Sequence, residues 1–178
     1  MLSAALTLCS LQETVDPYLL DVNGPGRIKV DQGFYRTRDG AAAGLADVGR
    51  ATEGVRFVFV GESHDQAAHH ELQALVIQSL AEAGRDVLVG FEMFTRDNQR
   101  NLAPWTLGWW SRKQFIESAN WKSQWGFDFG LYEPIFEVVR NHRLPMVALN
   151  VPRDWVRQVG RQGVTSLSDE QRKWVPDP

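Results

Sequence analysis

Three short runs of β-branched, aromatic and aliphatic residues, separated by stretches of helical periodicity, constrain the fold of this chain most. The runs cover 55–60, 87–91 and 146–149. The segment 67–83 repeats apolar residues at steps of three or four, and Gly84 follows it as a stop. Strands that alternate with helices favour right-handed crossovers between parallel strands. The sequence therefore predicts an α/β fold, with a parallel sheet core and helices on both faces.

The remaining segments complete this arrangement. We expect a turn-rich lead-in over 21–33, helices over 40–50, 131–141 and 153–162, a tryptophan-rich helical region over 98–126, and a capping box at Ser168 and Gln171. Three strands are few for such a sheet, and the last helix begins shortly before Pro178. We therefore expect a single domain over 21–178 that is partial and lacks its C-terminal part.

The first residues resemble the apolar end of a secretion signal. Residues 1–8 are mostly apolar and run into Cys9, which a lipid could modify. Basic residues are absent before this run, and Leu8 stands where a small residue is expected. We therefore expect a degenerate leader or the end of a lipoprotein signal over 1–20, with an ordinary helix start as the alternative. A single cysteine excludes a disulfide framework within the chain and a cysteine-rich zinc module.

Charge and hydropathy argue against two further classes of protein. The chain has 19 Lys and Arg against 22 Asp and Glu, a net charge of −3. No basic excess exists to neutralise phosphates, so nucleic-acid binding is disfavoured. After the leader-like segment, no stretch reaches the about 18 consecutive apolar residues that a transmembrane helix needs.

Polar side chains end each of the three predicted strands. Glu62 and His64 follow the first strand, Glu92 ends the second, and Asn150 ends the third. Ligands of open α/β sheets bind outside the carboxyl ends of the strands, so these side chains should line one edge. Two carboxylates beside an imidazole could hold a divalent metal or exchange a proton with bound water. The alternative is structural: Glu62 caps the next helix, and Glu92 pairs with an arginine such as Arg96.

Further imidazole, phenol and indole groups could contribute to this site. His69 and His70 begin the helix after His64, and because neighbours on a helix point about 100° apart, only one should face the site. We expect this to be His70, with a solvated histidine as the alternative. The phenol of Tyr132 could ligate ferric haem iron, or be a buried hydroxyl bonded to backbone.

The seven tryptophans all follow residue 104. Trp105 and Trp109, like Trp121 and Trp125, are four residues apart and should share a helix face. Such indoles suit a flat apolar ligand, but core packing or a subunit interface explains them equally well, which leaves a homodimer open.

Four stretches together resemble the ChaN-type haem-binding family, part of the wider Tiki-like superfamily. They are Gly61-Glu62-Ser63-His64-Asp65 with His69, His70 and Gln73; Gly90-Phe91-Glu92-Met93-Phe94 with Gln99; Trp121 and Trp125 to Phe129 with Leu131 to Pro134; and Ala148-Leu149-Asn150-Val151-Pro152-Arg153. Each is modest alone, but their order and combination across about 55–170 are specific. Members usually continue well beyond the segment that matches 163–178.

The resemblance implies a haem-binding protein of an iron or haem acquisition system, commonly lipid-anchored in the periplasm or at the outer membrane. His64, His70, Tyr132, Trp125 and Asn150 are then the residues expected at the haem. Relatives in the superfamily are metal-dependent hydrolases, so the alternative is an enzyme in which Glu62, His64 and Glu92 hold a metal that activates water. A truncated paralogue without a ligand is the second alternative. The residues alone do not decide whether the chain is an enzyme.

Overall fold

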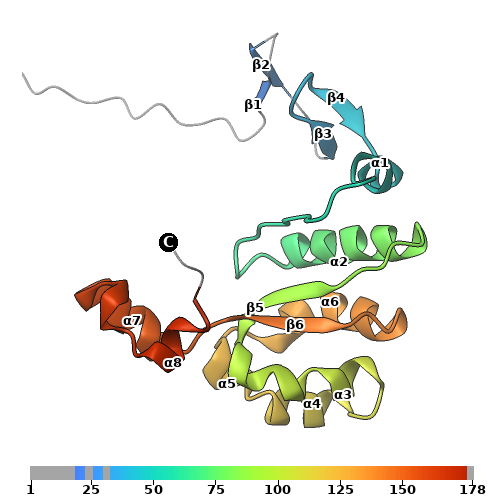
Figure 1. Cartoon of the computed structure of the whole chain (residues 1–178). Coiled ribbons are helices and arrows are strands. Elements are labelled where there is room, and N and C mark those ends of the chain that lie inside the picture. Colours follow the sequence, from blue (N-terminus) through green and yellow to red (C-terminus); the bar gives the residue numbers. More distant parts are fainter. Residues whose placement is uncertain (1–18, 23–25, 30–32, 176–178) are drawn as a thin grey trace, which may run out of the picture. The chain divides into compact units, whose positions relative to one another are not determined.

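A computed structural model describes residues 19–22, 26–29 and 33–175 of the chain (Figure 1). The chain divides into two compact units between Asp47 and Val48. The leader-like segment, with Cys9, lies outside the described residues except for Leu19 and Leu20. The expectation of a lipoprotein signal therefore stays a prediction.

The described part of the first unit contains two antiparallel hairpins. Strand β1 (Leu19–Val22) pairs with β2 (Gly26–Lys29), and β3 (Phe34–Arg36) pairs with β4 (Ala41–Ala43). In the second hairpin, the Asp39 carboxylate accepts hydrogen bonds from Arg36 Nε at 2.8 Å and from the Ala41 amide at 3.2 Å. These bonds close the turn and align Ala41 opposite Arg36.

Two expectations for this region need correction. The helix predicted over 40–50 begins later, as α1 (Leu45–Ala51), because residues 41–43 are drawn into the hairpin with β3. The turn-rich lead-in over 21–33 contains paired strands on both sides of its Asn-Gly-Pro sequence.

In the second unit, a pair of parallel strands carries the core. Strand β5 (Val89–Thr95) pairs with β6 (Met146–Asn150) in parallel, with Phe91 opposite Ala148 and Thr95 opposite Asn150. Between these two pairings β5 contains three residues and β6 contains one, so β5 bulges at residues 92–94. The bulge places Met93 and Phe94 in the core in succession, although neighbours on a regular strand point to opposite faces.

Helices α2 (Ala67–Glu82) and α6 (Phe129–Asn141) pack against each other, and α6 covers one face of β5 with aromatic side chains. Phe136 of α6 is fully buried and stacks on Phe91, with ring centroids 4.9 Å apart. The rings of Phe94, Trp105, Phe115, Trp121 and Phe129 also lie within 6.4 Å of the Phe136 ring. This aromatic cluster is the centre of the hydrophobic core.

The tryptophan-rich region folds into short helices rather than one long segment. They are η1 (Arg96–Asn101), α3 (Ala103–Thr106), α4 (Arg112–Ser118) and α5 (Trp121–Gln124). Because α3 ends at Thr106 and Gly108 follows with a φ of +72°, Trp105 and Trp109 do not share a helix face. Trp105 is fully buried and Trp109 is 72% exposed, so the expectation that they share a helix face is wrong.

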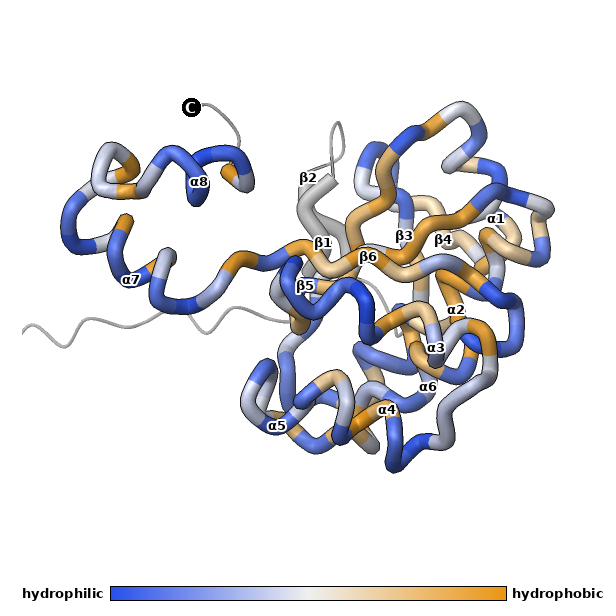
Figure 2. Tube along the Cα trace, turned by 60° about the horizontal axis from the view of Figure 1, so that its bottom comes forward, coloured by the Kyte–Doolittle hydropathy of each residue, from blue (hydrophilic) through white to orange (hydrophobic). Residues whose placement is uncertain are grey.

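The chain leaves β6 and forms α7 (Arg153–Gln162), η2 (Val164–Ser166) and α8 (Asp169–Arg172). The predicted capping box at Ser168 and Gln171 is confirmed at the start of α8. Helix α7 has no buried residue, and hydrophilic residues dominate its trace (Figure 2).

The strand predicted over 55–60 is not formed. Residues in this segment form no sheet, and Phe57 and Phe59 are 65% and 92% exposed. Gln73 of α2 holds the end of the segment by donating from Nε2 to the Val60 carbonyl at 2.8 Å. A β-prone composition gives an extended chain, but a strand also needs a partner for its backbone groups.

The fold class is therefore mixed α/β, with a parallel pair in place of the expected larger parallel sheet. Outward-facing residues of this pair are open: Glu92 is exposed and Leu149 is 50% exposed. The helical cover expected on the second face is not supplied by residues 48–175. That the chain is a partial domain stays a prediction.

Candidate functional site

Glu62 lies at the centre of the candidate site, in the turn between the 55–60 segment and α2. Its side chain is 5% exposed. The carboxylate accepts from His64 Nδ1 at 2.5 Å and from the Tyr132 hydroxyl at 3.3 Å through Oε1, and from His70 Nε2 at 3.3 Å through Oε2. Three side chains from a turn and two helices therefore fix its orientation.

The two neighbouring histidines at the start of α2 have different partners. His69 Nδ1 accepts a hydrogen bond from the Ser63 amide at 2.9 Å, which ties the 62–65 turn to α2. His70 is fully buried and faces Glu62. The rotation of about 100° between helix neighbours thus separates their roles, with His70 toward the site as the sequence suggested. Glu62 itself does not cap α2, whose N-cap is Gln66.

Tyr132 and His70 form a buried layer beneath Glu62. Both are fully buried, and their ring centroids are 3.9 Å apart. The Tyr132 hydroxyl donates to Glu62 Oε1 and to the His64 carbonyl, each at 3.3 Å. Burial, and then the negative charge of Glu62, raise the pKa of Tyr132 to about 12. A protonated, buried phenol can position Glu62, but it is poorly placed to ligate a metal as phenolate.

His64 is the imidazole of this group that solvent reaches, with a side chain 42% exposed. Its ring meets Trp125 and Phe127 edge to face, with centroids 4.5 and 5.2 Å away. Nδ1 is engaged by Glu62, and no residue in the described ranges bonds Nε2. His64 therefore presents one free ring nitrogen next to an aromatic wall.

Glu92 supplies the second carboxylate, from the bulge of β5 rather than from the strand end that the sequence predicted. One ligand atom each from Glu62, His64 and Glu92 lies within 4.8 Å of the others. Asn150, at the end of β6, donates from Nδ2 to the Glu92 carbonyl at 3.1 Å. The structure thus brings the predicted strand-end residues together, with Asn150 contacting the backbone of the bulge.

Arg96 does not neutralise Glu92. Its Nη1 donates instead to the Trp174 carbonyl at 2.8 Å, and Glu92 forms no ion pair with any described residue. The structural alternative for Glu92 is therefore wrong. The site keeps a carboxylate without a cationic partner, which is the state that suits a metal ligand.

Two residues at the site were not singled out from the sequence. Phe127 completes the wall against His64, and only its place beside Trp125 could have indicated this. Gln124 accepts from the Thr95 amide and hydroxyl through Oε1, at 3.1 and 3.0 Å. A glutamine that joins the end of β5 to α5 leaves no pattern in the sequence.

A mixed α/β unit in which two carboxylates and an open imidazole meet beside aromatic rings has the ligand atoms that could hold a metal ion or a metal-containing cofactor. The family model of the haem-binding uptake family of the Tiki superfamily, ChaN, matches residues 49–178. The chain belongs to this family. Searches of curated proteins and of solved structures found no match.

Proposed function

We propose that this protein binds haem in an iron or haem acquisition system, and that His64 Nε2 is the iron ligand. The observation that carries the proposal is the half-exposed His64 ring, held by Glu62 through Nδ1 and flanked by Trp125 and Phe127. Haem iron takes an imidazole as axial ligand, and the porphyrin needs an apolar surface. His64, in the turn before α2, supplies the imidazole, and Trp125 and Phe127 supply the apolar surface.

The residues around His64 fit this cofactor. A carboxylate that accepts from the other ring nitrogen fixes the tautomer and orientation of a ligating imidazole and raises its basicity. Glu62 occupies that position, and His70 and Tyr132 hold Glu62 from below. Bound haem would supply the redox-active iron. Since His70 and Tyr132 are fully buried, they support the site, and His64 is preferred among the candidate ligands.

Titration of haemin, followed at its Soret band, tests the proposal. The parent protein should show saturable binding, and His64→Ala should lose the spectrum of the imidazole complex. His142→Ala is the matched control, because His142 is an exposed histidine at the C-terminal end of α6. Equal binding by parent and His64→Ala would refute His64 as the ligand.

A metal-dependent hydrolase is the second candidate, favoured by the donor atoms of Glu62, His64 and Glu92 within 4.8 Å. In this case a divalent ion bound there would activate water. The candidate predicts that zinc or manganese raises the melting temperature of the parent protein, and that Glu92→Gln abolishes the rise. Saturable haemin binding without any effect of these ions would favour the first candidate.

We also propose a periplasmic location, or an anchor at the outer membrane. The uptake role in the family description and the apolar run before Cys9 support it. None of the helices in the described ranges has the length and apolarity to cross a bilayer. Fractionation of cells that express the full chain, with a Cys9→Ser variant, tests the location and the anchor separately.

A further inference from the structure

We infer that Arg153 binds a carboxylate group of the ligand, and so adds an anion-recognising group to an otherwise acidic site. The inference rests on the proposed haem function, because haem carries two propionate carboxylates at one edge of an apolar disc. Arg153 is the first residue of α7 and follows closely on the end of β6, next to the strand ends that frame the site.

Gln124 fixes the position of Arg153. Its main-chain carbonyl accepts from Arg153 Nη2 at 3.1 Å, while its side chain accepts from Thr95 at the end of β5. The next residue is Trp125, whose ring lies 4.5 Å from the His64 ring. The guanidinium of Arg153 is therefore bonded to the backbone of the residue that precedes Trp125, whose ring contacts the proposed iron ligand.

Arg153 has no acidic partner among the residues that the structure describes. Its only hydrogen bond goes to a neutral carbonyl, whereas Arg112 pairs with Glu133 at 2.6 Å and Arg157 with Asp154 at 3.2 Å. A guanidinium carries a planar fork of N–H donors that matches a carboxylate, and most of this fork is unused here. Arg153 is also exposed, so a ligand can reach it.

Charge decides where the carboxylates of a ligand would lie. Glu62 and Glu92 each place a carboxylate oxygen within 4.8 Å of a ring nitrogen of His64, and they would repel a further carboxylate. Arg153 is bonded to the residue before Trp125, and Arg96, next to Thr95, likewise donates to a carbonyl and to no acid in the described part of the chain. An apolar disc over His64 is therefore favoured with its acidic edge toward Arg153.

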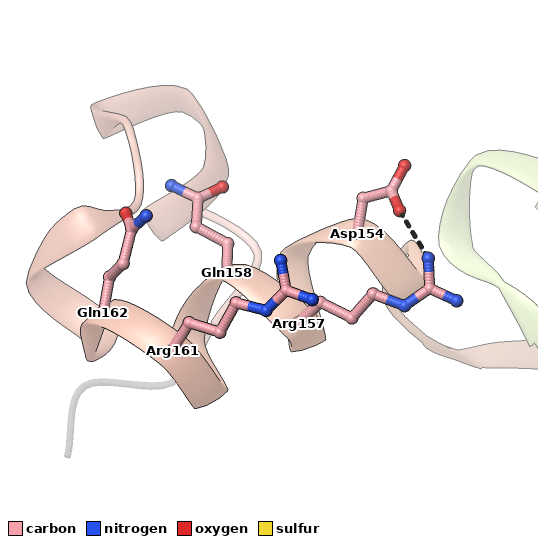
Figure 3. Close-up of a pocket in the computed structure, with 5 residues that line it drawn as sticks. All are labelled: Asp154, Arg157, Gln158, Arg161 and Gln162. Atoms are coloured by element: carbon pink, nitrogen blue, oxygen red, sulfur yellow. Dashed lines mark hydrogen bonds and ion pairs between the residues drawn. The ribbon is translucent and has the colours of Figure 1, made fainter.

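Helix α7 supplies a matched control. An open hollow along it is lined by Asp154, Arg157, Gln158, Arg161 and Gln162 (Figure 3). All five belong to one helix without a buried residue, so the hollow has no apolar wall to hold a ligand. Arg161, which makes no ion pair within the described part of the chain, is eight residues beyond Arg153, about 12 Å along the helix axis.

Titrations of haemin and of its dimethyl ester, in which both propionates are blocked, test the inference. The parent should bind haemin about tenfold more tightly than the ester, as expected for a charge-assisted hydrogen bond. Arg153→Gln should lose this preference and bind both ligands like the parent binds the ester. Arg161→Gln should behave like the parent.

The outcomes separate this inference from the proposed function. If the parent binds the ester as tightly as haemin, or if Arg153→Gln keeps the preference, Arg153 does not bind the carboxylate, although haem binding stands. An equal loss in Arg161→Gln would show a general effect of positive charge and overturn the inference. Absence of saturable haemin binding to the parent would end both proposals. The ester comparison uses the parent alone, so equal binding of haemin and ester overturns the inference even if Arg153→Gln does not fold.

Discussion

Glu62→Gln distinguishes the effect of Glu62 on ligand binding, through its hydrogen bond with His64, from its effect on the stability of the fold. The carboxylate accepts from three side chains, His64, His70 and Tyr132. The amide has almost the same shape, but one of its two ends donates. If the amide oxygen keeps the hydrogen bonds from His64 and Tyr132, the amide N–H₂ group faces His70 Nε2. That nitrogen must then accept a hydrogen bond instead of donating one.

The structure sets the expected magnitudes. His70 Nδ1 has no hydrogen-bond partner in the described residues, so the ring proton can move there at the expense of one unsatisfied buried donor, about 1 kcal/mol of unfolding free energy. The Tyr132 hydroxyl keeps the His64 carbonyl as an acceptor. Haemin affinity should fall more, by about 10- to 100-fold or about 1.4–2.8 kcal/mol, because a neutral amide supports the ligating imidazole less well.

The assay is a haemin titration together with urea unfolding of the same samples. Glu133→Gln is the matched control. Glu133 is also a carboxylate, on α6, but it pairs with Arg112, at a distance of 2.6 Å, and not with a residue of the site. It should leave haemin affinity unchanged. If Glu62→Gln binds haemin within about twofold of the parent and with the same spectrum, Glu62 does not act through His64, and the reasoning fails.

Three further predictions concern stability and titration. Phe136→Ala should lower the free energy of unfolding by about 3–5 kcal/mol, since Phe136 is fully buried among aromatic rings. Phe59→Ala, at a site 92% exposed, should change it by less than about 0.5 kcal/mol. Similar losses for both variants in urea unfolding would contradict the described core. Asp128→Ala should lower the free energy of unfolding by about 1 kcal/mol, because Asp128 Oδ1 accepts from the Gly130 amide at the start of α6. Asp128→Asn keeps an acceptor at this position, so it should lose much less stability in the same measurement. The pKa of Tyr132 is raised from 10.0 to about 12, so its contribution to stability is complete below pH 10 and is lost as the pH rises toward 12. Unfolding of Tyr132→Phe should not show this loss of stability. An equal decline in both proteins would assign the loss to other groups.

Local patterns were sufficient where the elements carry their own stop signals. The helix predicted over 67–83 is α2 (Ala67–Glu82), and Gly84 follows it with a φ of +74°. The strand predicted over 146–149 is β6 (Met146–Asn150). In both cases apolar spacing and a flanking turn residue lie within a few positions of each other, so no distant contact is needed to set the bounds.

The failures arise where distant contacts decide. Residues 55–60 have strand composition, but no partner strand pairs with them in the described ranges, and this property cannot be read from the segment itself. Glu92 was expected to end its strand, yet β5 continues to Thr95 because Met93 and Phe94 are buried against the helices. For the candidate site, the sequence indicated which side chains meet, while their different exposures, which favour His64 over His70 and Tyr132, followed only from packing.

The bulge in β5 makes the candidate site sensitive to insertions and deletions. Two fixed pairings, Phe91 with Ala148 and Thr95 with Asn150, define how many residues lie between them on each strand. Removing Met93 or Phe94 would change the number of residues between the two pairings, so that the bulge that presents Glu92 and the pairing of Thr95 with Asn150 could not both be kept. A substitution at Met93 that keeps its apolar volume would leave the frame intact. Changes of length in this stretch should therefore be far less tolerated than changes of side chain.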